Sequence, residues 1–282
     1  MIDLHTHSIF SDGSLTPEEL SDKAKETGLT AIALTDHDCT EGLPRFMKSC
    51  ERNSIVGIPG VEISIDIQKD TMHLLGYYID WSNVELQKAL KNIRTARESR
   101  NTKILERINA LGLSLKWEDV TAFAGGEVVG RPHFSQALIA KGYVADKEEA
   151  FTKYLAKGRS CYAERERLTD VQAIGVIRAA GGVPVLAHPL TLKLGNAKLK
   201  ETLADLKTKG LAGVEIFYSE HTPDMIKNYL TMAAELDLIA TGGSDFHGAA
   251  NPKIYLGRGF GNLDIPDDIV GKLKDWRQRQ IL

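Results

Sequence analysis

Residues 2–13 read IDLHTHSIFSDG, and this stretch indicates both the fold and the kind of site. Its apolar start predicts a strand over 2–4, which ends in His5 and His7. Side chains two positions apart on a strand point to the same face, so both imidazoles can reach one cation. Asp12 follows at once in the turn SDG. The chain therefore begins with three candidate metal ligands at the end of a strand.

Histidines and carboxylates recur after the later predicted strands. TDHD at 35–38 follows the apolar run at 31–34, and a strand over 54–61 ends at Glu62. Six of the eight histidines lie at or just beyond a strand end, usually beside an acid. Singly, each has a plainer explanation, such as a helix cap or a core histidine. Together they favour one site on one rim of a sheet. The nine candidate ligands are His5, His7, Asp12, His37, Glu62, His73, His188, Asp245 and His247.

The chemistry of these ligands narrows the metal. Imidazole and carboxylate without thiolate suit manganese, which we favour, or iron or zinc, and argue against a structural zinc knot. Nine ligands are too many for one ion, so we expect two or three divalent ions, with a carboxylate such as Glu62 bridging. Neighbouring ions can bind the oxygens of a phosphate and activate a water.

The bulk composition sets a plain background. The net charge of −3 in 282 residues gives no global basic signature, so any contact with nucleic acid must be local. The three cysteines lack CxxC spacing, which predicts free thiols in a reducing cytosol. There is no leader pattern and no apolar stretch of membrane-spanning length. We expect a cytoplasmic protein with no obligate protein partner.

Strand and helix alternate in two parts of the chain, which predicts an α/β fold with a mainly parallel sheet. About seven strands suit a barrel with its active site at the carboxyl ends of the strands. We expect barrel segments at 1–82 and 168–282, and a helical insert at 83–167 that covers the active site. Strands are expected over 2–4, 30–35, 54–61, 72–79, 183–187, 214–217 and 239–241, barrel helices over 17–27, 41–52, 171–180, 197–209 and 223–236, and insert helices over 84–111, 117–123, 132–140 and 147–155.

The motif series HTHSIFSDG, ALTDHD, PGVEIS, MHLLGY, VLAHP and GSDFH resembles the PHP superfamily, named for polymerase and histidinol phosphatase. GVEIS, the long insert, GRPHFS and GGVPVLAHP are most similar to its TrpH-type branch. That branch contains nucleoside 3′,5′-bisphosphate phosphatases and 5′→3′ exoribonucleases of short RNA. The resemblance implies a distorted (β/α)7 barrel.

The resemblance also implies how the ligands divide among the metals. Glu62 would be shared between the first two ions, and no ligand is missing. The first ion would take His5, His7, Glu62 and Asp245; the second Glu62, His73 and His188; the third Asp12, His37 and His247. From its position, Asp245 is a candidate to accept a proton from the attacking water.

The remaining candidates concern the substrate. Arg131 would lie at a helix N-terminus, where its fork can bind a phosphate, and His133 would bond the same anion or simply pack. Lys157 and Arg159 form a basic turn that would hold another phosphate or stay an exposed loop. His221, in the loop after a strand, would contact phosphate or protonate the leaving oxygen, with an exposed loop histidine as the plainer alternative.

These observations predict a metal-dependent phosphoesterase. It would remove the 3′-phosphate of nucleoside 3′,5′-bisphosphates, or trim short 5′-phosphorylated RNA, by attack of a metal-bridging hydroxide. Three alternatives stay open: a phosphatase of another ester such as histidinol phosphate, a metal-dependent amidohydrolase, and a non-catalytic module like the PHP domains fused to polymerases.

Overall fold

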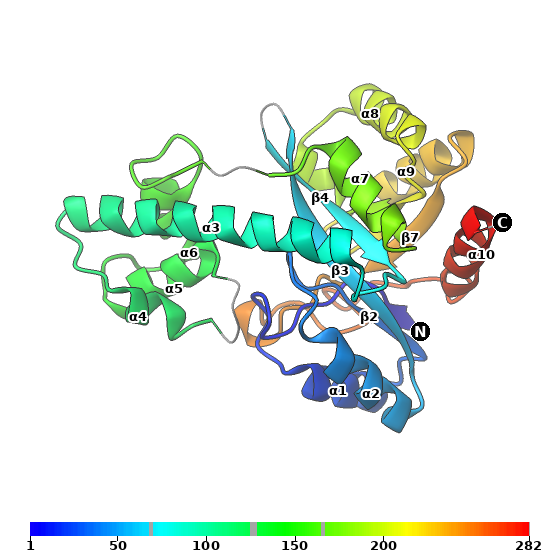
Figure 1. Ribbon diagram of the computed structural model, residues 1–282, viewed down its shortest axis with the longest axis horizontal. Coiled ribbons are helices and arrows are strands. Elements are labelled where there is room, and N and C mark those ends of the chain that lie inside the picture. The colour runs from blue at the N-terminus through cyan, green and yellow to red at the C-terminus, as the bar shows by residue number, and fades with distance from the viewer. Residues whose placement is uncertain (68–69, 125–128, 165–166, 282) are drawn as a thin grey trace.

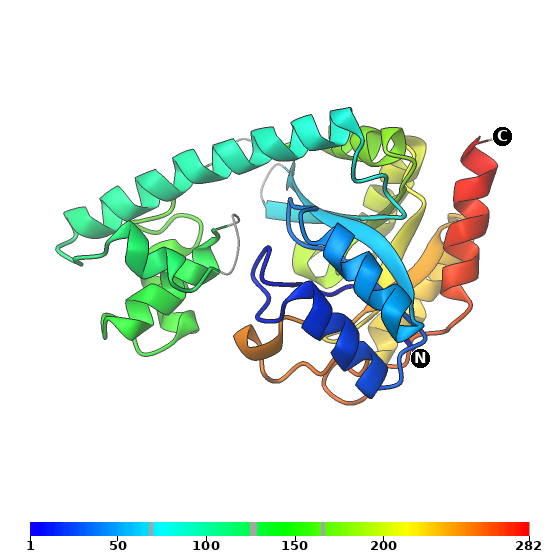
Figure 2. The same ribbon diagram turned by 60° about the horizontal axis from the view of Figure 1, so that its bottom comes forward.

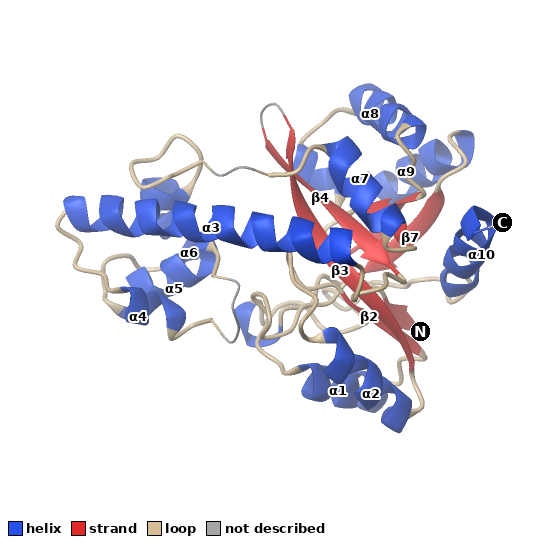
Figure 3. Cartoon of the chain, viewed as in Figure 1, coloured by secondary structure: helices blue, strands red, loops and turns tan. Residues whose placement is uncertain are grey.

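The computed structural model describes residues 1–67, 70–124, 129–164 and 167–281, and its described strands form one sheet in chain order (Figures 1 and 3). The strands are β1 (Ile2–Asp3), β2 (Ala31–Leu34), β3 (Val56–Ile67), β4 (Asp70–Tyr77), β5 (Val183–Leu186), β6 (Gly213–Tyr218) and β7 (Ile239–Gly243). Pairs β1–β2, β2–β3, β5–β6 and β6–β7 are parallel, whereas β4 is antiparallel to both its neighbours.

The two ends of the sheet meet and nearly close a barrel. The Leu4 amide donates to the Gly242 carbonyl over 3.3 Å, and Thr6 forms a parallel bridge with Phe246. Alternate residues of each strand then point inward or outward. On β2, Ala31 and Ala33 join the inner apolar cluster, while Ile32 and Leu34 pack under the helices. The predicted α/β barrel is confirmed.

One expectation about the strands is wrong. Glu62 was expected at a strand end, but β3 continues to Ile67 and forms an antiparallel hairpin with β4. Glu62 faces Leu75 across this ladder, and His73 faces Ser64. Glu62 therefore lies inside a strand and not at its end, and His73 lies inside β4, within the strand that was expected over 72–79. The two strands of the hairpin extend beyond the parallel strands, because they pair with each other along their full length.

Helices cover the outside of the barrel (Figure 1). Several begin at a recognisable signal: in α1, Thr16 accepts from the Glu19 amide and Glu19 bonds back to Thr16, while Pro17 occupies the first turn. The barrel helices are α1 (Pro17–Glu26), α2 (Leu43–Asn53), α7 (Asp170–Ala179), α8 (Asn196–Thr208), α9 (Pro223–Glu235) and α10 (Ile269–Ile281).

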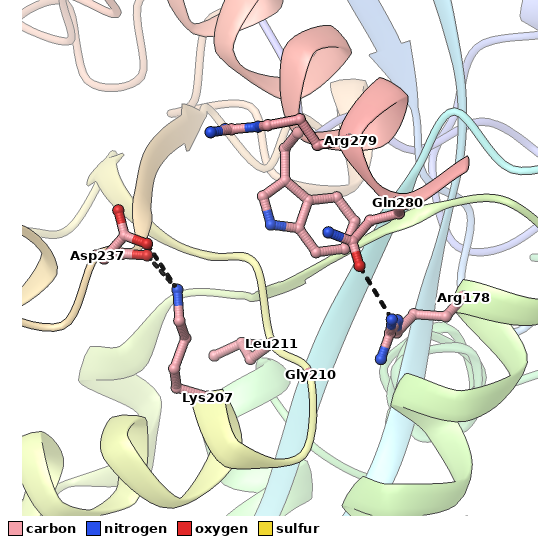
Figure 4. A pocket seen from close by; sticks show the side chains of 8 residues that line it. Arg178, Lys207, Gly210, Leu211, Asp237, Arg279 and Gln280 are labelled. Carbon is pink, nitrogen blue, oxygen red and sulfur yellow. Dashed lines mark hydrogen bonds and ion pairs between the residues drawn. The ribbon is translucent and has the colours of Figure 1, made fainter. Parts of the chain in front are cut away.

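The helix α10 was not anticipated. Its Ile269 and Leu273 join the inner cluster, so it closes the end of the barrel where the parallel strands begin. Arg178 of α7 donates to Gln280 over 3.0 Å (Figure 4). A cavity of about 310 Å³ lies here, and Lys207 on its wall contacts the Asp237 carboxylate at 3.4 Å. The hydrogen bond from Arg178 ties α10 to α7, whereas the ion pair of Lys207 with Asp237 joins α8 to the turn after α9.

The described residues between β4 and α7 are mainly helical (Figure 2). The long α3 starts against the barrel and extends beyond it, carrying the other helices on its far half. These share an apolar cluster of their own, built on residues 104–163. The elements are α3 (Val84–Ala110), α4 (Trp117–Thr121), α5 (Arg131–Ala140), α6 (Lys147–Ala150) and the π-helix η1 (Phe151–Leu155). In the described ranges no helix is long and apolar enough to span a membrane.

Candidate metal centre

All nine proposed ligands lie at one end of the barrel. They form four overlapping groups, and the potential ligand atoms in each group lie within 4.8 Å of one another. The groups are His7, Asp12, His37 and His247; His5, His7 and Asp245; His5, Glu62 and His188; and His37, Glu62 and His73. His7 and His37 each belong to two groups. They therefore connect the ligand set that the resemblance gives to the third ion with the sets of the first and second ions.

Glu62 lies at the centre of the cluster and is fully buried. Its two oxygens face different imidazoles: Oε1 lies 2.7 Å from His73 and 3.0 Å from His188, and Oε2 lies 3.2 Å from His5, 3.3 Å from His7 and 3.0 Å from His37. Burial by itself would raise the pKa of Glu62, but the surrounding imidazoles hold that pKa well below its usual range. The carboxylate is ionised and can serve two cations at once.

Several buried polar atoms of the cluster fit divalent ions. His7 Nε2, Asp12 Oδ1 and His37 Nδ1 find no hydrogen-bond partner within the described part of the chain. They lie within ion-pair distance of neighbouring side chains but without the geometry of a hydrogen bond, which is costly for buried atoms unless something else coordinates them. Burial lowers the pKa of His37 to about 4, in spite of Glu62 and Asp12, so this ring is neutral and offers a lone pair. A nitrogen and oxygen set of this kind suits manganese, iron or zinc.

Asp245 joins the cluster from the segment after β7. Its backbone has a φ of 59°, in the left-handed region that is uncommon outside glycine. This turn places its Oδ1 3.1 Å from His7 and 3.4 Å from His5. The hydroxyl of Tyr218 donates to Oδ2 over 3.1 Å. Burial would raise the pKa of Asp245, but the neighbouring imidazoles keep it well below its usual range.

Glu215 on β6 was missed by the sequence reasoning. Its Oε1 accepts from His5 Nδ1 over 3.0 Å, and its Oε2 accepts from the His188 amide over 2.7 Å. With the proton on Nδ1, the Nε2 lone pair of His5 points toward Glu62, as a ligating histidine requires. A signal was present: GVE at 213–215 repeats GVE at 60–62, and an acid inside a buried apolar strand needs a partner.

Two further acids hold the loops that carry the ligands. Asp36 accepts hydrogen bonds from Ser8 and Ser11, which fixes the turn before Asp12. Asp38 accepts from the Ser64 amide over 3.0 Å and pairs with Arg97 of α3. The long helix is therefore bonded directly to the segment that carries His37.

A cavity of about 330 Å³ opens beside the cluster. Three proposed ligands line it, namely Asp12, Asp245 and His247, and α5 supplies much of another wall, including His133. His133 is buried, and its Nδ1 accepts from the Gly130 amide over 3.0 Å. Because burial also lowers its pKa, the ring is neutral and Nε2 carries the proton. His133 thus has a donor available for an anion.

The other candidates in the insert lie in different surroundings. Arg131 is the first residue of α5, as expected. Its guanidinium lies over the rings of Phe151 and Tyr162 and donates to the Leu155 carbonyl over 3.2 Å. Burial lowers its pKa, and the charges of Arg167 and Arg97 lower it further. Lys157 and Arg159 are exposed in the turn after η1.

The structure does not bring His221 into the cavity beside the cluster. It lines a separate cavity of about 550 Å³, and Tyr218 borders both cavities. The Nδ1 of His221 donates to the Ile216 carbonyl over 2.8 Å, and burial lowers its pKa. Its Nε2 therefore has no proton to give, which weakens the idea that it protonates a leaving group.

Fold and site together define a metal-dependent hydrolase on a seven-stranded barrel. The sequence model of the PHP domain family matches residues 3–166, more than half of the chain, and the chain belongs to this family. The comparisons show a metal-dependent phosphoesterase of that family.

Similar proteins cover almost the whole chain. The 3′,5′-nucleoside bisphosphate phosphatase of Chromobacterium violaceum is 34% identical over 87% of this chain and 87% of its own length. The 5′-3′ exoribonuclease Rnm of Salmonella typhimurium is 34% identical over 99% of this chain and 94% of its own. A solved protein of Bifidobacterium adolescentis, provisionally assigned as a metal-dependent phosphoesterase, has a TM-score of 0.86 at 31% identity, covering 96% and 94%. A solved Chromobacterium violaceum protein described as an amidohydrolase, with bound sulfate and no metal, gives the same score and identity, covering 96% of each chain.

Proposed function

We propose that this enzyme removes the 3′-phosphate from nucleoside 3′,5′-bisphosphates, and that it also trims short RNA with a 5′-phosphate. The observation that carries the proposal is the cavity that joins the histidine and carboxylate cluster to the wall formed by α5. One end of it suits a reacting phosphate, and the other end is formed by the insert. The relatives named above as a bisphosphate phosphatase and an exoribonuclease support the same substrate class.

The nine residues of the cluster would hold two or three divalent ions, with manganese the first choice and iron or zinc the alternatives. Such ions would lower the pKa of a water and polarise the oxygens of the phosphate. Glu62 has one oxygen toward His73 and the other toward His37, so it would hold neighbouring metal sites together. Asp245 stays ionised, borders the cavity and is our candidate to accept a proton there.

The insert would supply the second point of attachment. His133 offers an N–H donor beside Asp12, at the boundary between the cluster and α5. Arg131 is held in place by two aromatic rings, so it would meet a phosphate with little loss of side-chain freedom. Lys157 and Arg159 are exposed and would attract the backbone of a longer RNA. A second phosphate bound here would orient the reacting one.

Steady-state rates under manganese, zinc and iron test the proposal. Adenosine 3′,5′-bisphosphate is expected to have the highest kcat/KM and to give the 5′-monophosphate. The comparison set contains the two adenosine monophosphates, histidinol phosphate and an N-acyl amide, which represent the alternative phosphatase and the amidohydrolase. Equal rates on all phosphate esters, or hydrolysis of the amide alone, would contradict the proposal.

A further inference from the structure

The cavity beside the cluster has a wall that the chemistry of phosphate does not explain. Residues from one face of α5 line it, at the spacing of one side of a helix, and they lie beyond the cluster on the insert side. They are Pro132, Ser135, Gln136 and Ile139. None of these four carries a charge, so this face of α5 presents no cation to a phosphate, although the insert also contributes Lys147 of α6 to the lining of the cavity.

Two polar atoms on this wall lack partners. The Oγ of Ser135 and the Oε1 of Gln136 are buried and find no hydrogen-bond partner among the described residues. Ser135 is only 1% exposed, so solvent does not serve its hydroxyl. A buried polar group left unpaired costs about 1–3 kcal/mol. Two such groups side by side on a cavity wall indicate a ligand with complementary donors and acceptors.

The facing wall comes from the barrel. It is formed around the short helix η3 (Gly248–Ala250), shown in orange on the side of the barrel that faces the insert (Figure 2). Asn251 and Ile254 line the cavity from this segment, and Ile254 is buried. Ile139 of α5 lines the same cavity, so apolar side chains from the insert and from the barrel border one space.

We propose that this part of the cavity is a nucleobase subsite, in which Ser135 and Gln136 hydrogen-bond the edge of the base. Ile139 and Ile254 contact its faces. A nucleobase is a flat heterocycle with hydrogen-bond donors and acceptors on its edge and apolar faces. It can therefore bond to the polar side chains of the cavity and pack against the apolar ones. The volume of about 330 Å³ is at the small end for ligand pockets, which suits one nucleotide unit.

This inference rests on the proposed function, because the base is placed by its connection to a phosphate at the cluster. A carboxamide such as that of Gln136 can pair with a ring nitrogen and an exocyclic amino group together, the pattern that adenine presents. We therefore expect adenine to be preferred over uracil.

The test compares two substrates that differ only in the base. They are 2′-deoxyadenosine 3′,5′-bisphosphate and the abasic 1,2-dideoxyribose 3,5-bisphosphate, so both keep the two phosphates. In the native protein the kcat/KM ratio should favour the nucleotide by about tenfold or more, the effect of one buried hydrogen bond. Gln136→Ala and Ser135→Ala should each bring the ratio toward one. The exposed Gln278 of α10 provides the matched control, and Gln278→Ala should leave the ratio as it is.

The outcomes separate the two ideas. A native protein that uses both substrates equally well, or variants that keep the native ratio, would overturn the base subsite while the phosphatase stands. Should the native protein hydrolyse neither compound, the proposed function fails. Calorimetric titration with 2′-deoxyadenosine 5′-monophosphate then decides the subsite alone, because binding should weaken about tenfold in Gln136→Ala. Gln136→Glu, which keeps the volume, replaces the alanine variant if that does not fold.

Discussion

His5 donates a hydrogen bond from Nδ1 to the carboxylate of Glu215 over 3.0 Å, deep in the barrel. The same carboxylate accepts from the amide of His188, so one buried acid on β6 positions two proposed ligands, which follow β1 and β5 in the chain. Without this acid, the proton of His5 could move to Nε2, where it would block coordination.

Glu215→Gln should therefore reduce metal affinity or turnover by about 10–100-fold. The glutamine has only one acceptor oxygen for these two donors. If its NH₂ group faces Nδ1 of His5, the proton of that ring would move to Nε2, and if it faces the amide of His188, that amide would lose its acceptor. Metal content by atomic emission and kcat measure the effect. The exposed Glu201 is the matched control, and Glu201→Gln should behave as native. Full metal content and native turnover in Glu215→Gln would remove the orienting role.

Glu62→Gln should reduce turnover by at least about 10²-fold, because the amide removes the negative charge that the neighbouring metal sites would share. Circular dichroism should show an intact fold, since the contacts of the Glu62 carboxylate are with histidine side chains of the cluster and not with the apolar core. Rates near native at full metal content would contradict a bridging role.

Metal analysis of purified protein should find two or three ions per chain, clustered within a few ångströms in anomalous density. Chelation should lower the thermal midpoint, because an ion at 100 times its Kd stabilises the folded state by about 2.7 kcal/mol. Re-addition of manganese should restore the midpoint. A single ion remote from His5 and Asp245 would refute the assignment.

Arg131→Ala should reduce kcat/KM for a 3′,5′-bisphosphate by roughly 2–4 kcal/mol of transition-state binding. The loss on p-nitrophenyl phosphate, which has no second phosphate, should be much smaller. Since Arg131 also packs on Phe151 and Tyr162, Arg131→Lys and a thermal melt separate lost charge from lost packing. Equal losses on both substrates would place the guanidinium at the reacting phosphate.

Arg97→Met should destabilise the protein by about 3–5 kcal/mol, because it breaks the buried ion pair between Arg97 and the carboxylate of Asp38. Denaturant unfolding measures this loss. Adding Asp38→Asn in the same chain should recover part of it, and a purely additive double variant would show that the two residues are not coupled.

Local sequence signals gave the elements of the barrel with small errors at their ends. Apolar runs, proline in the first turn and capping residues act over a few positions, so a single chain reveals them. The hairpin of β3 and β4 was not foreseen, because antiparallel pairing past Gly60 depends on which strand lies alongside. The helix α10 was also missed, since the apolar residues on its inner face can be recognised as core residues only when the end of the barrel that they cover is known.

The sequence by itself determined the types and order of the proposed ligands and the barrel, because each proposed ligand follows or lies in a segment whose periodicity can be read locally. Only the tertiary structure decided which of the proposed ligands lie together, that Glu215 bonds to His5, and that His221 lies beyond Tyr218 in another cavity. It also decided that Ser135 and Gln136 face the cluster across a common space. Those relations join residues far apart in the chain, and they depend on strand pairing and helix packing, which local patterns do not encode.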